Sequence, residues 1–576
     1  MTAHPDERRP HPADPLGPDG RSAAVGRAFH VRDAGGPGRP RPEGRMLTEG
    51  KPTEGKRTEG KPADGEPVPV GSRGRIVMLV DNDVERDSRV QKAAASAAAA
   101  GWEVHLLGCV LARRGRSWML SGARVRLLPL RHTLRRNRHG IVRATLRRPL
   151  AYAHPSVAAY RRRLVQSRRS DLAASRIAPG GGPVRKAWLL ARRAAARVQV
   201  RWVAVRVHRT ESLAAARNDP LSPLERCAIR FWQALLGDRA WRVLDRNLWD
   251  WDGAYRHVVD ELEPDIIHAN DFRMLGVGAR AARRAHARGR ETKLVWDVHE
   301  FLPGIMPWGG AGPGWLPAMC AHEREYAGAA DAVVTVSDAL ADRLVERHGL
   351  RRRPAVVLNA PLTRGGTGRT EPVPDLRELC EAGPDAQIAV YSGRASVQRG
   401  LDVMIEALPR LPRLHVALVV STVRSEYLRG LRARAIELGV ADRVHMLPYV
   451  PYNQVVPFLA AADIGVIPIH HWPNHEIALI TKFFEYSHAR LPIVVSDVQA
   501  MGAMVKATGQ GEVFRAEDLD DYVRAVEAVR GDPQRYRAVY DDRPDLLREW
   551  SWEAQAEVLD GVYSRLLPAP AGHTGG

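Results

Sequence analysis

Cysteine is scarce in this sequence. The chain of 576 residues has four cysteines, Cys109, Cys227, Cys320 and Cys380, and their spacing fits neither a metal site nor a redox motif. Small secreted domains that are held together by disulfides need many closely spaced cysteines, so that class of protein is excluded. We expect free, mostly buried thiols and a reducing compartment.

Long apolar runs are also absent. No run of about 18 apolar residues, the length that crosses a bilayer, occurs in the chain. The first residues contain no apolar segment of the kind found in signal peptides. We therefore predict a cytoplasmic protein, which could lie peripherally at the inner face of a membrane.

Acidic residues are outnumbered by basic ones. The chain has 66 Asp and Glu against 86 Lys and Arg, which gives a net charge of +20. Such a surface attracts nucleic acid, anionic lipid or acidic polymers. No nucleic-acid-binding motif accompanies the charge, so we predict no specific nucleic-acid partner. We retain an anionic membrane surface as a candidate peripheral partner.

The composition divides the chain into folded and unfolded parts. Hydrophobic residues make up 44% of the sequence, and the length allows two or three domains. Residues 1–73 are rich in Pro, Gly, Arg and Asp and contain a short repeat, TEGKPTEGKRTEGK. Because such segments bury too little apolar surface to fold, we predict disordered tails at 1–73 and 568–576.

An α/β pattern begins at Arg75. RIVMLV predicts a buried strand, the residues up to Trp102 predict a loop and a helix, and EVHLLG predicts a second strand. The N-terminus of a helix that follows a strand can accept an anion. Asp87, Arg89 and Lys92 lie there, and we consider both a direct ligand contact and simple capping of the helix.

Residues 112–252 form a basic segment that we predict to be a mainly helical insertion. Steps of 100° per residue place one set of residues on the same side of a helix: Trp188, Ala191, Ala195, Val198, Trp202 and Val205. A second set falls opposite: Lys186, Arg193, Arg197 and Arg201. A basic amphipathic helix with Trp on its apolar face is typical of interfacial membrane binding. The alternative is a helix whose apolar face packs on the domain.

Polar residues follow several of the predicted strands. PDIIHAND and KLVWDVHE end in His268, Asn270, Asp271, His299 and Glu300. Open parallel sheets place their ligand site at the carboxyl ends of the strands. These residues are therefore candidate site residues, with a buried histidine and hydrogen bonds to loop backbone as the alternatives.

A second α/β series starts with IAVYSG at Ile388 and includes NHEIALITKFFEYSHARLPIVVSD. In that stretch a helix carries Lys482 and Glu485 three residues apart, so both side chains lie on one face. Together they could hold an anionic group and a diol, and a surface ion pair is the alternative. We expect two doubly wound Rossmann-like domains facing a cleft that suits two substrates. The predicted parts are an N-terminal domain at 74–361, a linker at 362–385, a C-terminal domain at 386–545 and a helix at 546–567.

Seven blocks carry a resemblance to a known family. Besides the stretch quoted above they are DSRVQKAAASAAAAGWEV, PDIIHANDF, LVWDVHEFLP, ADAVVTVSDALADRL, VVLNAP and YSGRASVQRGLDVMIEAL. In order and position they resemble the GT-B glycosyltransferases of family 4, which are retaining enzymes. The likeness covers roughly residues 75–110 and 255–566. It implies a GT-B fold and transfer of a sugar from a UDP- or GDP-sugar.

The resemblance implies a donor site in the C-terminal half. Positions that match Arg394 and Arg399 reach the donor diphosphate in similar enzymes, where the second is usually lysine. Glu485 matches the glutamate that holds the ribose hydroxyls, and Lys482 would add charge beside the phosphates. The full set of implied donor residues is Gly393, Arg394, Arg399, His475, Glu476, Lys482 and Glu485. The other family glutamate falls on Ile477, so we assign its role to His475 and Glu476 or to backbone amides.

The resemblance implies an acceptor site in the N-terminal half, for a glycan, a lipid-linked or a small-molecule acceptor. His299 stands where similar enzymes keep a histidine near the reacting centre, and Asp87, Arg89, Asp271 and Glu300 are the other acceptor candidates. We expect catalysis by His299 and the three cations, with no metal and no cofactor. The alternatives are an epimerase or phosphorylase of the same fold, or a non-catalytic scaffold that binds membrane or nucleic acid.

Overall fold

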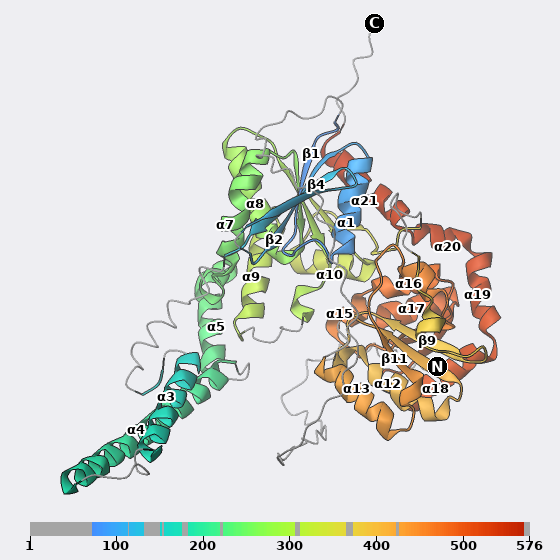
Figure 1. The fold of residues 1–576 in the computed structure, drawn as a ribbon. Helices are drawn as coiled ribbons and strands as arrows, with labels where there is room; N and C mark the ends of the chain where they lie inside the picture. Colours follow the sequence, from blue (N-terminus) through green and yellow to red (C-terminus); the bar gives the residue numbers. More distant parts are fainter. Residues whose placement is uncertain are drawn as a thin grey trace, which may run out of the picture. The chain divides into compact units, whose positions relative to one another are not determined.

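The structure is a computed structural model. It describes residues 72–112, 114–131, 150–152, 155–174, 182–218, 223–305, 312–363, 372–421 and 425–568. Almost all of the predicted tail at 1–73, and the tail at 568–576 except for its first residue, lie outside the described residues. Two parallel sheets with helices on their faces make up the described part (Figure 1), which confirms the predicted α/β class.

The first sheet has eight strands in the order β3-β4-β2-β1-β5-β6-β7-β8. All neighbours pair in parallel except β3 and β4. The order reverses between β1 and β5, where an open sheet places its ligand site. The strands are β1 (Arg75–Leu79), β2 (Glu103–Val110), β3 (Arg116–Leu120), β4 (Ala123–Pro129), β5 (Ile266–Asn270), β6 (Lys293–Val298), β7 (Ala332–Thr335) and β8 (Ala355–Val356).

Both faces of this sheet are covered because its strands are apolar on both sides. In β1, Val77 and Leu79 belong to the core on one face, whereas Ile76 and Met78 belong to the core on the other. That is the pattern of a buried parallel strand. The helices of this half are α1 (Ser88–Ala99), α3 (Pro155–Ala174), α4 (Pro183–Asn218), α5 (Pro223–Leu236), α6 (Trp241–Leu244), α7 (Leu248–Leu262), α8 (Asp271–Ala287), α9 (Trp315–Ala327) and α10 (Asp338–His348).

The second sheet has six parallel strands in the order β11-β10-β9-β12-β13-β14. Numbered within this half, the order is 3-2-1-4-5-6, the arrangement of dinucleotide-binding domains, with its reversal between β9 and β12. The strands are β9 (Gln387–Ser392), β10 (Leu414–Val419), β11 (Val444–Leu447), β12 (Ile464–Ile467), β13 (Ile493–Ser496) and β14 (Gly511–Phe514).

Helices flank this sheet as well. The stretch around Lys482 forms two short helices, α15 and α16, instead of one. The helices of this half are α11 (Leu376–Leu379), α12 (Leu401–Glu406), α13 (Glu426–Glu437), α14 (Val455–Leu459), α15 (Pro473–Ile477), α16 (Thr481–His488), α17 (Gln499–Thr508), α18 (Leu519–Gly531), α19 (Pro533–Asp542), α20 (Pro544–Glu549) and α21 (Trp552–Leu566).

The last helix, α21, returns to the first sheet and packs beside α1 (Figure 1). Trp552 and Tyr563 are buried in the core of the β1 face. Trp552 Nε1 donates to the Ser96 hydroxyl at 2.9 Å, and Trp102 Nε1 donates to Asp560 at 2.7 Å. The C-terminal helix therefore completes the N-terminal half, although the two are far apart in the sequence.

The prediction of a mainly helical segment at 112–252 was wrong for its first part. β3 and β4 form an antiparallel pair there, and β4 continues the main sheet beside β2. In β4 the buried residues Ala123, Val125 and Leu127 alternate with exposed ones, the period of a strand with one covered face. Residues 132–149 lie outside the described residues, and α3 to α7 follow. No helix of the described residues is long and apolar enough to cross a membrane.

Candidate functional site

The loop after β9 is shaped by one glycine. Gly393 has φ +145°, a conformation that side chains rarely allow, and a Cβ atom there would lie 2.2 Å from Lys482 Cε and 2.3 Å from Nζ. The Lys482 ammonium therefore lies directly against the backbone of Gly393. The loop is also tied to the end of β12, because the His470 amide donates to the Gln398 carbonyl at 3.0 Å. Both strands of the order reversal thus contribute to one site.

Three cations surround this loop. Arg394 is exposed, whereas Arg399 and Lys482 are half-buried. Within the described part of the chain, none of the three charged groups makes a hydrogen bond or an ion pair, and Lys482 Nζ lies 5.4 Å from the centre of the Tyr391 ring. Burial, together with the neighbouring Arg399, lowers the pKa of Lys482 to about 8. Such a cluster of unpaired cations is suited to receiving an anion.

Glu485 lies one turn from Lys482 on α16, as the spacing predicted. The alternative of a surface ion pair was wrong, since no ion pair joins these two side chains in the described residues and both are half-buried. Burial raises the pKa of Glu485, and Lys482 and Lys92 partly oppose that rise. The carboxylate has no hydrogen-bond partner among the described residues, so its oxygens are available to a diol.

His475 and Glu476, on α15, differ in whether a side-chain atom is left available to a ligand. His475 is 9% exposed, its Nδ1 lies 2.7 Å from the His470 carbonyl, and burial lowers its pKa. This contact assigns the proton to Nδ1 and leaves Nε2 as an acceptor. Glu476 accepts a hydrogen bond from the Gln499 amide at 2.9 Å and lies 2.7 Å from His471 Nδ1. Its carboxylate is occupied within the protein, so His475 is the better placed of the two.

His299 is held between two carboxylates at the ends of β5 and β6. Its Nδ1 lies 3.2 Å from Asp271 Oδ2, and its Nε2 lies 3.3 Å from Asp297 Oδ2. Burial disfavours the imidazolium, but the two carboxylates outweigh burial and raise the pKa of His299 well above its usual value. The raised pKa favours the imidazolium form of His299, which cannot act as a general base while it is charged.

Asp271 adopts an unusual backbone conformation. Its φ is +59°, in the left-handed region, and its Oδ1 accepts from the His299 amide at 3.4 Å. Such conformations cost about 1–3 kcal/mol and are common at functional sites. The side chain of Asp271 thus holds both the backbone and the ring of His299.

Asp297 is the centre of a buried charge network that the sequence did not reveal. It accepts from Arg89 Nε at 3.1 Å and from Nη2 at 3.0 Å, and His268 Nε2 lies 3.4 Å from it. His268 Nδ1 in turn lies 2.8 Å from the Tyr563 hydroxyl of α21. Burial raises the pKa of Asp297, but Arg89 and the two histidines lower it well below its usual value. The only signal in the sequence is that Asp297 lies near the end of β6, two residues before His299.

The two candidates on the first helix have internal partners. Asp87 caps α1 by accepting from the Val90 amide at 3.2 Å, and it accepts from Asn82 at 2.8 Å. Arg89 is 4% exposed and donates to Asp297 and to the Val357 carbonyl. For Asp87 the structure favours the capping alternative, and Arg89 holds Asp297 from the interior. A direct acceptor contact by either residue stays a prediction.

Electrostatics link the residues of the two halves. The pKa of Glu300 is raised overall, mainly by burial and by the nearby Asp271. His299, Arg399 and Arg394 partly oppose that rise. The Asn474 side chain accepts from the Phe301 amide at 2.8 Å, which joins the loop after β6 to α15 directly. The structure thus brings the acceptor candidates His299, Asp271 and Glu300 near the cations of the Gly393 loop.

Lys92 is a further residue near this site. It is 5% exposed, and its Nζ lies 4.7 Å from the centre of the Trp552 ring. Burial lowers its pKa to about 7, which Glu485 partly opposes. The sequence pattern placed it with Asp87 and Arg89 at the start of α1. No group of three or more His, Cys, Asp or Glu side chains suited to a metal ion occurs among the described residues.

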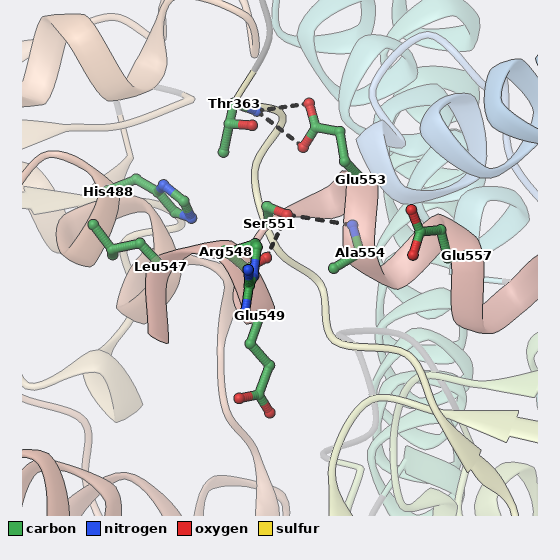
Figure 2. Close-up of a pocket in the computed structure, with 9 residues that line it drawn as sticks. All are labelled: Thr363, His488, Leu547, Arg548, Glu549, Ser551, Glu553, Ala554 and Glu557. Carbon is green, nitrogen blue, oxygen red and sulfur yellow. Dashed lines mark hydrogen bonds between the residues drawn. The ribbon is translucent and has the colours of Figure 1, made fainter. Parts of the chain in front are cut away.

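A cavity of about 500 Å³ lies elsewhere, where the chain enters α21. Figure 2 shows Glu553 directed at the amide of Thr363, which donates to both carboxylate oxygens at 3.1 and 3.2 Å. None of the candidate site residues lines this cavity, and its wall carries Glu549, Glu553 and Glu557 beside Arg548. No residue of the Gly393 loop lines it.

Two family models match the chain. Residues 377–542 match the glycosyl transferases group 1 model, and residues 180–360 match the model of glycosyltransferase family 4. The first match contains the whole Gly393 loop together with α15 and α16. The second contains β5, β6 and β7 with their polar carboxyl ends.

Curated proteins that are similar in sequence to this chain are described as glycosyltransferases. A D-inositol 3-phosphate glycosyltransferase of Xylanimonas cellulosilytica is 27% identical, over 52% of this chain and 72% of that protein. A GDP-mannose-dependent alpha-(1-6)-phosphatidylinositol monomannoside mannosyltransferase of Mycolicibacterium smegmatis is 27% identical, over 51% of this chain and 78% of that protein. The chain spans only 55–58% of three further inositol 3-phosphate glycosyltransferases.

A solved structure shares the fold. The sucrose-phosphate synthase of Thermosynechococcus elongatus covers 86% of this chain with all of its own length, at a TM-score of 0.54 and 14% identity. This likeness shows the shared fold, and the two family models give the family. The chain belongs to the GT-B glycosyltransferases of family 4.

Proposed function

We propose that this protein transfers a sugar, with retention of the anomeric configuration, from a UDP- or GDP-sugar to a glycan, lipid-linked or small-molecule acceptor. The observation that carries the proposal is the set of unpaired charges around Gly393: Arg394, Arg399 and Lys482 as cations, and Glu485 as the anion. A nucleotide-sugar presents the complementary groups, a diphosphate and a ribose diol. The relative that is described as GDP-mannose-dependent supports such a donor.

In this proposal the cations bind the diphosphate and stabilise the charge that develops on it as the sugar leaves. Glu485 accepts hydrogen bonds from the ribose hydroxyls, and His475 Nε2 faces the donor sugar. The leaving charge is stabilised by arginine and lysine, so we expect no metal or other cofactor to be required. Lys482, with a pKa of about 8, regains its full charge when the anion binds.

His299, with Asp271 and Glu300, would receive the acceptor. His299 Nε2 is buried without a hydrogen-bond partner among the described residues, so the imidazolium would donate a hydrogen bond from this atom and orient a hydroxyl or a sugar oxygen. The acceptor oxygen would attack the anomeric carbon on the face from which the diphosphate departs. The relatives' names point to inositol phosphate and phosphatidylinositol mannoside as the first acceptors to test. A lipid-linked acceptor would place the protein peripherally at the inner face of a membrane.

The test is a transfer assay that follows release of the nucleoside diphosphate together with formation of the glycosylated product. We expect release that depends on an added acceptor, and an anomeric configuration in the product that matches the donor. Glu485→Ala should abolish the reaction by removing the ribose contact. Glu527→Ala, an exposed glutamate on α18, is the matched control and should leave the reaction unchanged.

The alternatives make different predictions. An epimerase would interconvert nucleotide-sugars without an acceptor, and a phosphorylase would consume inorganic phosphate. A non-catalytic scaffold would neither bind nor turn over a nucleotide-sugar. The proposal would be refuted if product formed at the same rate with and without an added acceptor. It would also be refuted if Glu485→Ala were as active as the wild type.

A further inference from the structure

Helices α3 and α4 carry most of the excess positive charge of the protein. They pack side by side (Figure 1) and contain 14 Lys and Arg against two Asp and Glu. Their net charge of +12 is more than half of the +20 of the whole chain. Charge concentrated on 56 of 576 residues indicates an anionic partner for this part of the molecule.

One face of α4 is used for packing. Val203 and Val207 form a small core with Ala158 and Val165 of α3. This face continues to Thr210, whose hydroxyl accepts from the Tyr152 amide at 2.9 Å. The packing face of α4 is therefore already covered by residues of the chain itself.

The predicted apolar face of α4 is a different one, and it is exposed. Trp188, Val198, Trp202 and Val205 are 54%, 69%, 49% and 48% exposed, and we call them the α4 stripe. At 100° per residue Val198 and Val205 lie opposite Val203 and Val207, Trp202 lies about 100–140° from them, and Trp188 lies about 60–100° from them, nearer the packing face. The alternative in which this apolar face packs on the domain was therefore wrong. Contiguous exposed apolar side chains of this kind mark an interaction surface.

Arginines border the α4 stripe on both sides. Arg201, which is exposed, lies about 40° from Val205 at one edge, and Arg197, also exposed, lies about 80° from Val205 and so further from the stripe. On the other edge the Arg192 guanidinium lies 4.4 Å from the centre of the Trp188 ring. The only acidic residue of α4 is Glu211, which pairs with Arg162 of α3 at 3.3 Å, beyond the end of the stripe.

We propose that the α4 stripe is a docking surface for an anionic lipid bilayer. In this arrangement α4 lies in the plane of the interface, Trp188 and Trp202 enter the headgroup region, and the bordering arginines contact lipid phosphates. The phosphates of nucleic acid could bind the arginines, but nucleic acid has no apolar layer in which Val198 and Val205 could be buried. An apolar protein partner would leave the net charge of +12 unmatched. The proposal stands whether or not the donor site acts as proposed.

The test is sedimentation of the full chain with vesicles, either pure phosphatidylcholine or phosphatidylcholine with about one third phosphatidylglycerol. We expect binding to the anionic vesicles and far weaker binding to the neutral ones. The double variant Trp188→Ala, Trp202→Ala should lose at least tenfold in partitioning, and Arg197→Ala with Arg201→Ala should lose roughly 30-fold at low salt, about fivefold for each charge. The four side chains are exposed, so these variants should fold, which circular dichroism will check.

Ile436→Ala is the matched control, since Ile436 is 63% exposed on α13 in the other half of the protein. It should bind anionic vesicles as the wild type does. Negligible binding to both kinds of vesicle would overturn the proposal. So would binding that the tryptophan variant leaves unchanged, since the charge alone would then explain it. Tighter binding to a short DNA duplex than to the vesicles, lost in the tryptophan variant, would assign the stripe to nucleic acid instead.

Discussion

Replacing Gly393 by alanine should damage the donor site through Lys482. A Cβ atom at this position would lie 2.2 Å from Lys482 Cε, and the end of the lysine side chain can move more easily than the backbone. The φ of +145° adds about 1–3 kcal/mol of strain for any residue with a side chain. We therefore expect a modest loss of stability and a displaced ammonium group.

The loss of affinity can be estimated. A hydrogen bond to a charged group contributes about 1.5–3 kcal/mol, so displacement of the ammonium should weaken binding of a nucleoside diphosphate roughly 10- to 150-fold. Isothermal titration calorimetry measures this loss, and urea unfolding measures the stability. Gly430→Ala is the control, because Gly430 lies in α13 with no atom within 4 Å of its Cβ position. That variant should bind normally and unfold at the same or a higher urea concentration.

A double-mutant cycle with Lys482→Met tests the route of the effect. If Gly393→Ala acts by displacing Lys482, the double variant should bind no more weakly than Lys482→Met alone, apart from any loss of stability. Wild-type affinity of Gly393→Ala would refute the reasoning. Fully additive losses would show that the glycine acts through something other than the lysine.

Three further predictions concern the charges. Because the pKa of Lys482 is lowered to about 8, affinity for a nucleoside diphosphate should fall as the pH rises above about 8, and calorimetry on Lys482→Met should give a weaker affinity without this dependence. Asp271→Asn removes one of the two carboxylates that keep His299 charged, so the pKa of His299 should fall and the pH–rate profile should lose activity at a lower pH than in the wild type. Asp297→Asn leaves Arg89 buried without its counter-ion, so urea unfolding should show a loss of about 3–5 kcal/mol, whereas an effect below 1 kcal/mol would contradict the role of the pair.

Local sequence patterns predicted the C-terminal half well. The apolar run IVVS is β13, and the spacing of Lys482 and Glu485 places both on one face of α16. The glycine loop after β9 lies against Lys482, which is about 90 residues further along the chain. The strand and the shared helix face follow from short-range periodicity, which a sequence displays directly, whereas only the family resemblance implied that Gly393 and Lys482 belong to one site.

The features that were missed depend on long-range contacts. Asp297 meets Arg89 across 208 residues, and Tyr563 meets His268 across 295, so no local pattern indicates either pair. The return of α21 to the first sheet is likewise invisible, because an amphipathic helix does not specify its partner. β3 and β4 fall in the segment predicted to be mainly helical, because the basic stretches from Arg131 onward dominate its pattern.

Glu476 shows a limit of a different kind. Its position in the sequence suggested a donor contact, but the amide of Gln499 and His471 already occupy its carboxylate. Whether a charged side chain is available depends on its partners, which only the fold reveals. The same comparison favours Glu485, whose carboxylate has no hydrogen-bond partner among the described residues.

The most direct test of the central claim is thermal unfolding of the wild type and of Glu485→Ala with UDP- and GDP-sugars, each with and without EDTA. A ligand that binds only the folded state raises the melting temperature. The account predicts a rise for the wild type with one of the two nucleotide families, unchanged by EDTA and absent in Glu485→Ala. No rise with any nucleotide-sugar, or an equal rise in the variant, would contradict it.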